Sequence, residues 1–381
     1  MKSIPTSYRS RVEIDARALT HNLRVFRKLV KNNVRVMVVV KSNAYGHGLV
    51  ECAKLFSGRT ATGGTTANVV DWLGVDDLDE ALALRKSGIK LPLLVLGYTL
   101  PARYTEAAKS NISVTVSSIE SLRHSLKIEN RKLKIHLKLE TGLNRQGITE
   151  TELTEALKFL RTLEHVMLEG AYSHFAGDAP KFTKFSQKQS VSFNRMAKQI
   201  ENALDRNVIK HIADTAATVL LPQSHLDMVR IGIGSYGLDP FSDPKLPIVK
   251  KLKLKPALSW YSIIAQVKSV KKGERVGYDL TEKLKRDSTL AIVPVGYWHG
   301  YPRSLSSKGE VLVRGRRCKV VGRVSMDMMT IDVTSVPGVK LGDVVTLIGK
   351  GLSAEGVATK AGTINYELVT RINPKLPRVY K

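Results

Sequence analysis

The stretch Val38-Val-Val-Lys-Ser-Asn-Ala-Tyr-Gly-His-Gly48 combines a buried strand, a charged strand end and a glycine-rich turn. Residues 37–40 form a continuous apolar run, mostly β-branched, which is typical of a strand covered on both faces in a parallel sheet. The run ends at Lys41, and the asparagine and two glycines that follow predict a tight turn with positive φ. Lys41 is therefore expected at the carboxyl end of a strand, where α/β barrels carry out their chemistry.

A charged ammonium group at a buried strand end is costly unless it has a function. In partly apolar surroundings a lysine has a lowered pKa, and its free amine can form a Schiff base with a carbonyl compound. The alternative is a structural lysine whose stem covers apolar surface while its ammonium group reaches solvent. Lys41 taken alone does not separate the two.

Length and composition favour a soluble globular protein of two domains. The 381 residues are 43% hydrophobic and 25% charged, with no signal-peptide pattern and no apolar run of transmembrane length. Cys52 and Cys318 lie far apart and form no metal-ligand cluster, so we expect no metal site. A reduced, cytoplasmic protein is the simplest prediction.

The net charge of +26 would attract anionic ligands and would allow weak binding to nucleic acid. Lysines and arginines are nevertheless scattered along the chain, without a basic block that contains interleaved aromatic residues. We therefore interpret the charge as a solvated basic surface, with nucleic-acid binding as the alternative. Neither a specific nucleic-acid partner nor a membrane partner is expected.

Strand and helix patterns alternate over the first part of the chain, beginning with Asp15, which can cap a helix over residues 16–30. Eight strand candidates follow, at residues 36–40, 71–75, 91–96, 112–116, 134–140, 168–174, 209–213 and 228–232. Eight βα units in roughly 200–250 residues describe a TIM (β/α)8 barrel. A doubly wound sheet is the competing fold, but no Gly-x-Gly-x-x-Gly sequence opens a helix after the first strand.

The pattern changes in the Pro- and Asp-rich stretch 239–247, which predicts a linker. Beyond it, short β-rich runs punctuated by Gly and Pro predict a mostly-β domain, at residues 258–270, 289–295, 310–313, 318–321, 328–333 and 343–348. We expect a barrel domain over residues 1–245 and a β domain over 246–381, with roughly the first 12 residues able to pack against the β domain.

Reactive side chains fall at several predicted strand ends, namely Lys41, His174, Thr215 and Arg230. In a barrel these positions converge on one rim. Each has a structural explanation when taken singly, such as a buried histidine or an arginine paired with a carboxylate. Their joint placement is what indicates an active site.

Residues 38–48 resemble the cofactor-lysine motif of the alanine racemase family, pyridoxal-phosphate enzymes of fold type III. The resemblance continues in the same order along almost the whole chain. It implies a barrel that binds pyridoxal 5'-phosphate, a β domain, a small amino-acid substrate and a homodimer that shares its active sites. Lys41 would carry the cofactor and Tyr45 would lie close to it.

Three further motifs resemble the family's cofactor-binding segments. In Arg230-Ile-Gly-Ile-Gly-Ser-Tyr-Gly237, the arginine would face the pyridine nitrogen, and the amides of Gly232 and Ile233 would bind the phosphate. In His211-Ile-Ala-Asp-Thr-Ala-Ala217, Thr215 would add a hydroxyl, although Asp214-Thr215 stands where the family usually has Asn-Ser. In Ile364-Asn-Tyr-Glu367, Tyr366 would contact the phosphate or the pocket.

Other motifs resemble the family's substrate-binding segments. Arg145, in Leu137-Lys-Leu-Glu-Thr-Gly-Leu-Asn-Arg-Gln-Gly147, would bind the substrate carboxylate, and Lys138 matches a lysine that is often carbamylated. Met326 and Asp327 would line the substrate pocket. Tyr297 matches the entry channel, but Trp298-His299 stands where Ala-Asp is usual.

The second catalytic base implied by the resemblance is Tyr278, in Glu274-Arg-Val-Gly-Tyr-Asp279, contributed by the second subunit. From sequence alone, Tyr278 reads as a packing residue in a strand. Lys41 and Tyr278 would serve opposite faces of the substrate, as inversion at one carbon requires. His174 would connect Arg230 to Tyr278.

The resulting hypothesis is interconversion of L- and D-alanine, which would supply D-alanine for cell-wall synthesis. A racemase of broader or different specificity, for serine or lysine, is an alternative. A related barrel decarboxylase would be expected to place an acid at the pyridine nitrogen, and Arg230 argues against it. A cofactor-carrying barrel without racemase activity would lack residues 251–381.

Overall fold

The computed structural model describes residues 8–58, 70–125, 132–177, 180–241 and 248–381. Its first layer is a parallel sheet of eight strands: β2 (Arg35–Val39), β3 (Trp72–Val75), β4 (Leu93–Tyr98), β5 (Ser113–Val116), β6 (Leu133–Lys138), β7 (Val166–Tyr172), β8 (Ile209–His211) and β9 (Met228–Ile231). Their order is β8-β7-β6-β5-β4-β3-β2-β9. The amide of Asp227 donates to the carbonyl of Lys210 at 3.1 Å, and that of Arg230 to Ala213 at 3.0 Å, so the last two strands nearly close the barrel.

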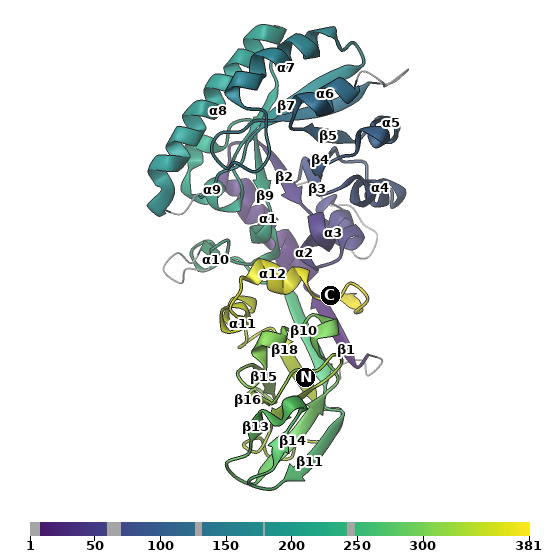
Figure 1. Ribbon diagram of the computed structural model, residues 1–381, viewed down its shortest axis with the longest axis vertical. Helices are drawn as coiled ribbons and strands as arrows, with labels where there is room; N and C mark the ends of the chain where they lie inside the picture. Colours follow the sequence, from purple (N-terminus) through teal and green to yellow (C-terminus); the bar gives the residue numbers. More distant parts are fainter. Residues whose placement is uncertain (1–7, 59–69, 126–131, 178–179, 242–247) are drawn as a thin grey trace.

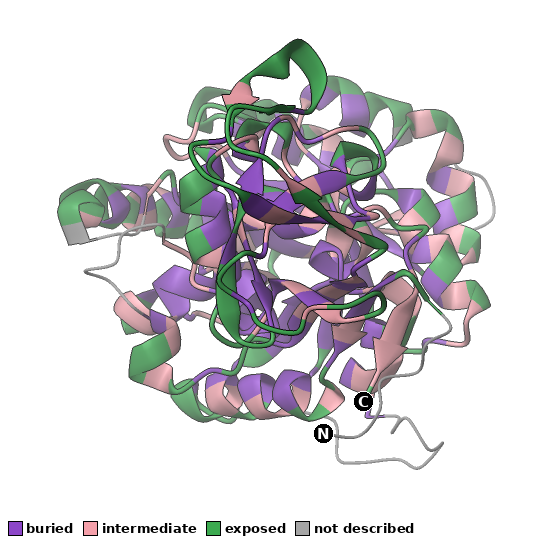
Figure 2. Cartoon of the chain, turned by 90° about the horizontal axis from the view of Figure 1, so that it is seen from below, coloured by how far each residue is buried: buried purple, intermediate pink, exposed green. Residues whose placement is uncertain are grey.

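Helices cover the outside of the barrel and place their polar faces in solvent (Figures 1 and 2). They are α1 (Ala16–Leu29), α3 (Leu49–Phe56), α4 (Leu78–Lys86), α5 (Tyr104–Lys109), α6 (Ile119–Ser125), α7 (Glu150–Thr162), α8 (Thr183–Leu204), α9 (Thr215–Leu220) and α10 (Ile248–Leu252). Local sequence sets their starts. Asp15 accepts from the amide of Ala18 at 2.9 Å, and Thr149 with Glu152 forms a capping box at α7.

The second layer is a nine-stranded sheet in the order β11-β14-β17-β16-β15-β18-β10-β1-β19. Its strands are β1 (Ser10–Ile14), β10 (Leu258–Ile263), β11 (Gln266–Val270), β14 (Ser288–Val293), β15 (Glu310–Val313), β16 (Arg316–Val321), β17 (Met329–Asp332), β18 (Val344–Ile348) and β19 (Arg378–Tyr380). Two short strands, β12 (Arg275–Val276) and β13 (Glu282–Lys283), pair separately. The predicted TIM barrel followed by a mostly-β domain is confirmed.

The first and last strands of the described chain lie side by side where the barrel joins the β domain. Strand β1 pairs antiparallel with β10 and parallel with β19. Helix α12 (Asn365–Thr370) lies between the β domain and the short segment α2 (Lys41–Tyr45), and α11 (Ala354–Ala361) lies beside it (Figure 1). Segments more than 300 residues apart in sequence therefore meet at one rim of the barrel.

Several details differ from the sequence-based expectations. Helices α5, α9, α11 and α12 were not expected, because they are short and lie among strand or turn signals. Tyr278 lies in a 3-10 turn, Tyr278–Leu280, and not in a strand. The linker predicted at residues 239–247 lies mostly outside the described residues, so the domain boundary near 245 stays a prediction. No described helix is both long and apolar enough to cross a membrane.

Candidate active site at the carboxyl rim of the barrel

A cavity of about 380 Å³ opens at the carboxyl ends of the barrel strands. Below this cavity, the barrel interior is filled by the side chains of Met37, Trp72, Leu94 and Met228. A ligand therefore has room at the carboxyl rim and not inside the barrel. Most of the predicted site residues line the cavity: Lys41, Tyr45, Arg145, His174, Thr215, Arg230, Gly232, Ile233 and Tyr366. Lys138 also lines it.

Lys41 lies just past the end of β2 and carries its ammonium group to the cavity. Its Nζ lies 3.1 Å from Oδ1 of Asp76, and its side chain is 38% exposed. The surroundings are therefore less apolar than the strand pattern suggests. Asp76 was missed from the sequence, although it follows the apolar strand β3 in the same way that Lys41 follows β2.

The segment that carries Lys41 turns in the left-handed sense. Ser42, Asn43, Ala44 and Tyr45 all have φ between 51° and 56°. A left-handed conformation costs roughly 1–2 kcal/mol for each residue with a Cβ, and it rarely continues for more than one residue. The sequence indicated positive φ at Asn43 and at the two glycines of this turn, but not at Ser42, Ala44 and Tyr45.

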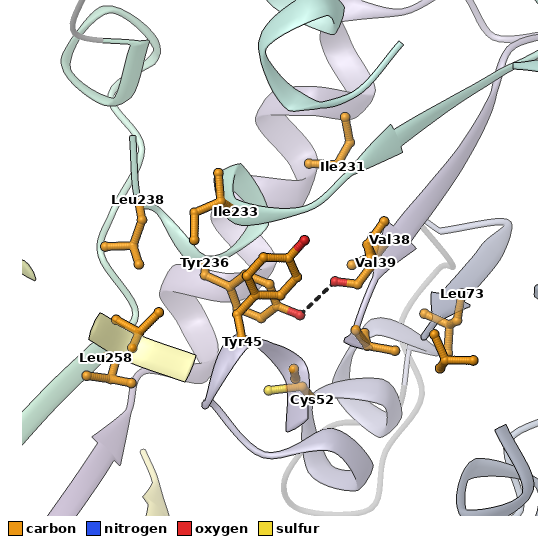
Figure 3. Packing of buried hydrophobic residues seen from close by; sticks show 14 of the residues in the cluster. Val38, Val39, Tyr45, Cys52, Leu73, Ile231, Ile233, Tyr236, Leu238 and Leu258 are labelled. Atoms are coloured by element: carbon orange, nitrogen blue, oxygen red, sulfur yellow. Dashed lines mark hydrogen bonds between the residues drawn. The ribbon is translucent and has the colours of Figure 1, made fainter. Parts of the chain in front are cut away.

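Tyr45 and Tyr236 form the floor below this turn (Figure 3). The Tyr236 hydroxyl donates to the carbonyl of Val39 at 3.0 Å, and the two tyrosine rings lie 5.2 Å apart. Burial raises the pKa of Tyr45, so its hydroxyl stays protonated and able to donate. A side chain at Gly232 would bring its Cβ to 2.7 Å from this hydroxyl.

Thr215 and the backbone after β9 form a small polar cradle beside Tyr45. The amides of Gly232 and Gly234 donate to the Thr215 hydroxyl oxygen at 3.0 and 3.5 Å. Gly232 thus gives its amide to Thr215 in this structure, while Thr215 keeps its own proton for another acceptor. Asp214 lines the cavity but accepts from the amide of Ala217 at 3.0 Å and caps α9.

Arg230 is buried and held by four acceptors. It donates to the carbonyls of Ser173 and Ile212, both at 2.9 Å, and to Nδ1 of His174 and His211, at 3.1 and 3.0 Å. A guanidinium group only donates, so both histidines must accept at Nδ1 and carry their proton on Nε2. The arginine is fixed in place, and it stays charged because its pKa is too high for it to lose a proton.

A chain of histidines continues from Arg230 into the barrel. Nε2 of His211 lies 2.9 Å from Nδ1 of His136, whose Nε2 is 3.5 Å from Oε2 of Glu169. Burial, followed by the charge of Arg230, lowers the pKa of His211 well below its usual value. Burial likewise lowers the pKa of His174 to about 4. These imidazoles are neutral at physiological pH.

Lys138 is the last residue of β6 and lines the cavity. Burial, and then the charges of Arg145 and Arg230, lower its pKa to about 8. Its ammonium nitrogen lies 3.5 Å from Oε1 of Gln146 and 5.5 Å from the centre of the Tyr172 ring. Tyr172 and His211 were not singled out from the sequence, although both belong to predicted strands that end at this rim.

Four predicted site residues lie outside this cavity in the single chain. Tyr278, Tyr297 and Met326 are 70%, 42% and 53% exposed on the β domain, and Asp327 is exposed beside them. Among the described residues, no cluster of three or more histidine, cysteine, aspartate or glutamate side chains is arranged to hold a metal ion.

The barrel, the β domain and the cavity around a strand-end lysine define an enzyme of the barrel type with an appended β domain. Residues 14–240 match "Alanine racemase, N-terminal domain", and residues 257–380 match "Alanine racemase, C-terminal domain". The chain belongs to the alanine racemase family of amino-acid racemases.

Individual relatives agree over nearly the full length. "Alanine racemase 2" of Caldanaerobacter subterraneus subsp. tengcongensis is 38% identical over 97% of this chain and 94% of its own. The alanine racemase of Methanococcus maripaludis is 38% identical over 97% of both chains. The Bacillus anthracis alanine racemase with bound L-Ala-P has a TM-score of 0.89 and 36% identity, over 99% of this chain and 96% of that one.

Proposed function

We propose that this protein interconverts L- and D-alanine with pyridoxal 5'-phosphate bound at Lys41. The observation that carries the proposal is the cavity, which brings Lys41, Arg230 and the Thr215 cradle together at one barrel rim. The alanine racemases that match over nearly the whole chain support the choice of substrate. The D-alanine would supply cell-wall synthesis, and a cytoplasmic location stays a prediction.

The lining of the cavity suits the phosphate group of the cofactor. Neutral donors surround one end, from Tyr45, Thr215 and the backbone at Ile233, with Tyr366 close by, and such donors suit a phosphate. The missing side chain at Gly232 leaves room for the Tyr45 hydroxyl to reach this end. When bound, pyridoxal phosphate would supply the electron sink that makes the α-proton of the amino acid acidic.

Lys41 would serve as the base on one face of the substrate, and its partly exposed ammonium group lies at the cavity, 3.1 Å from Oδ1 of Asp76. Arg230 would face the ring nitrogen as a permanent cation that cannot give up its proton. With this cation opposite it, the ring nitrogen would not gain a full proton, which would limit side reactions. Arg145 would bind the substrate carboxylate through its planar fork.

Tyr278 would be the base on the opposite face, contributed by a second copy of the chain. Its exposure in a single chain accords with a role completed by dimer formation. Because His174 accepts from Arg230 at Nδ1, its Nε2 carries a proton directed away from the arginine. This Nε2–H group would donate a hydrogen bond to the phenol oxygen of Tyr278 and so stabilise the phenolate. Met326, Asp327 and Tyr297 would complete the substrate pocket from the same copy.

The test is incubation of the purified protein with each enantiomer of alanine, serine and lysine, followed by chiral analysis. We expect incubation with either enantiomer of alanine to give the same mixture of L- and D-alanine. The Lys41→Ala variant should leave each enantiomer unchanged. Release of carbon dioxide together with the corresponding amine would instead indicate a decarboxylase. Faster conversion of serine or lysine than of alanine would show that the pocket is specific for another amino acid, which Trp298 and His299 make the leading alternative.

A further inference from the structure

The left-handed turn that carries Lys41 is held by strand β19, from more than 300 residues away in sequence. Nε and Nη2 of Arg378 donate to the carbonyl of Gly46 at 3.1 and 3.0 Å. The hydroxyl of Tyr380 donates to the next carbonyl, that of His47, at 2.7 Å. These two carbonyls end the turn, so β19 fixes the side of the turn opposite to Lys41.

Arg378 is itself locked in position. Its remaining donors bind the carbonyls of Ile372, Asn373 and Leu376, at 3.1, 2.7 and 2.7 Å. The guanidinium group therefore joins four backbone carbonyls and ties the chain after α12 to the Lys41 turn. A lysine could reach one or two of these carbonyls but could not reproduce the planar fork.

The glycines of the motif fit the same contact. A Cβ at Gly46 would lie 2.0 Å from the carbonyl oxygen of Val369 in α12, and a Cβ at Gly48 would lie 2.1 Å from the Tyr380 hydroxyl. Real side chains essentially never come this close to their neighbours. The two glycines thus allow α12 and β19 to press directly on the backbone of the turn. From the barrel side, Glu80 accepts from the amide of Asn43 at 3.1 Å and from the amide of Asp76 at 3.0 Å.

We infer that Arg378 and Tyr380 are positioning residues that hold Lys41 in its reactive orientation by clamping this turn. Four consecutive left-handed residues are not stable by themselves, because each places its Cβ against the following carbonyl. When the clamp is released, the turn should relax and carry the Lys41 side chain out of register with the cavity. The inference rests on the proposed function, because it concerns the lysine that would bind the cofactor.

The test compares Arg378→Lys with Arg85→Lys. Arg85 is a matched control, because it also donates to four backbone carbonyls, those of Ile89, Leu91, Ser110 and Asn111, and it takes no part in the Lys41 turn. Pyridoxal phosphate is added to cofactor-free full-length protein. Covalent attachment at Lys41 is followed by absorbance and by peptide mapping after borohydride reduction.

We expect attachment in Arg378→Lys to be roughly ten- to hundredfold slower, as when a reacting group is displaced by about 1 Å. Arg85→Lys should lose comparable thermal stability but attach the cofactor at the wild-type rate. Equal attachment rates in the two variants would overturn the inference. If Arg378→Lys does not fold, Tyr380→Phe removes a single donor and should show a smaller loss in the same direction.

A second measurement does not depend on the cofactor. Hydrogen exchange of peptides that cover residues 41–48 should be faster in Arg378→Lys and unchanged in Arg85→Lys. Unchanged exchange at residues 41–48 in Arg378→Lys would show that β19 does not hold the turn. A wild-type protein that never attaches pyridoxal phosphate would refute the proposed function, while the exchange measurement would still decide whether the clamp exists.

Discussion

At the scale of the residue, the surroundings of Lys138 lower the pKa of its amine and so make the amine more reactive. The residue is 5% exposed, and its burial, together with the charges of Arg145 and Arg230, lowers its pKa to about 8. A neutral amine is the form that reacts with carbon dioxide, so a lysine of this pKa is partly reactive at physiological pH. The product would be an anion beside Arg145.

We therefore predict that Lys138 is carbamylated when bicarbonate is present. Carbon-13 NMR of the protein in labelled bicarbonate should show a carbamate signal that is absent from Lys138→Arg. The signal should persist in Lys134→Arg, which alters a more exposed lysine on the same strand. A signal of equal strength in the Lys138→Arg variant would assign the carbamate to another amine.

The same pKa has a consequence for stability in the absence of carbon dioxide. Below pH 8 the folded protein must bury a charged Lys138, and this penalty is relieved as pH rises from about 8 towards the usual lysine value of 10.5. Lys138→Met should thus stabilise the protein most below pH 8, with a gain that shrinks at higher pH. Denaturant unfolding at several pH values measures this. A gain independent of pH would mean that Lys138 is not buried as a cation.

At the scale of the element, helix α9 is capped by an acidic side chain, that of Asp214. This cap lies next to Thr215, which belongs to the proposed phosphate site. Asp214 satisfies the amide of Ala217, yet its charge also faces the cavity. An acidic side chain near a phosphate is unfavourable, and the hydrogen bond to the amide offsets only part of this cost. The unfavourable charge nevertheless remains near the site.

Asp214→Asn should keep the cap and remove the charge. We predict unchanged thermal stability and tighter binding of pyridoxal phosphate, because asparagine and aspartate cap helices about equally well. Asp214→Ala is the matched control and should lose about 1 kcal/mol of stability, the usual value of a cap. Titration of each cofactor-free variant measures the affinity. Weaker binding in Asp214→Asn than in the wild type would assign the carboxylate a positive role.

At the scale of the whole molecule, the β domain carries an exposed apolar surface. We call it the Tyr278 surface, and it consists of Tyr278, Leu280, Tyr297, Trp298, Met326 and Met328. The amides of Tyr297 and Trp298 donate to the carbonyls of Ser325 and Met326, both at 3.0 Å. An ion pair of 3.4 Å between Arg323 and Asp279 links the turn of Tyr278 to the chain just before Met326. Exposed apolar side chains that lie close together are typical of interaction surfaces, and we predict that this surface binds another protein chain. A second copy of the chain is the partner that the proposed two-base mechanism requires.

Mixing inactive Lys41→Ala with inactive Tyr278→Phe should restore activity if each site uses residues from two chains. A heterodimer would then contain one site with both residues intact, so about half of its sites would work. Racemisation is measured after subunit exchange, which labelled subunits verify independently. Verified exchange without any return of activity would show that the site is not shared, or that Tyr278 is not the base.

The sequence by itself determined the barrel, the β domain and the place of Lys41, because these follow from local periodicity. Apolar runs, caps and glycine turns act over a few residues, and they can be read without knowledge of the fold. The same local signals placed His174 and Arg230 at one rim, since barrel strands point the same way.

Only the tertiary structure decided how these residues are held. Local signals indicated a turn after Lys41, but the contacts of Arg378 and Tyr380 that hold this left-handed turn come from the far end of the chain. The neutral histidines behind Arg230 depend on strands β6 and β8 lying on either side of β7. Contacts between residues hundreds of positions apart depend on how the barrel closes and on how the β domain packs against it. No local sequence pattern encodes these two arrangements.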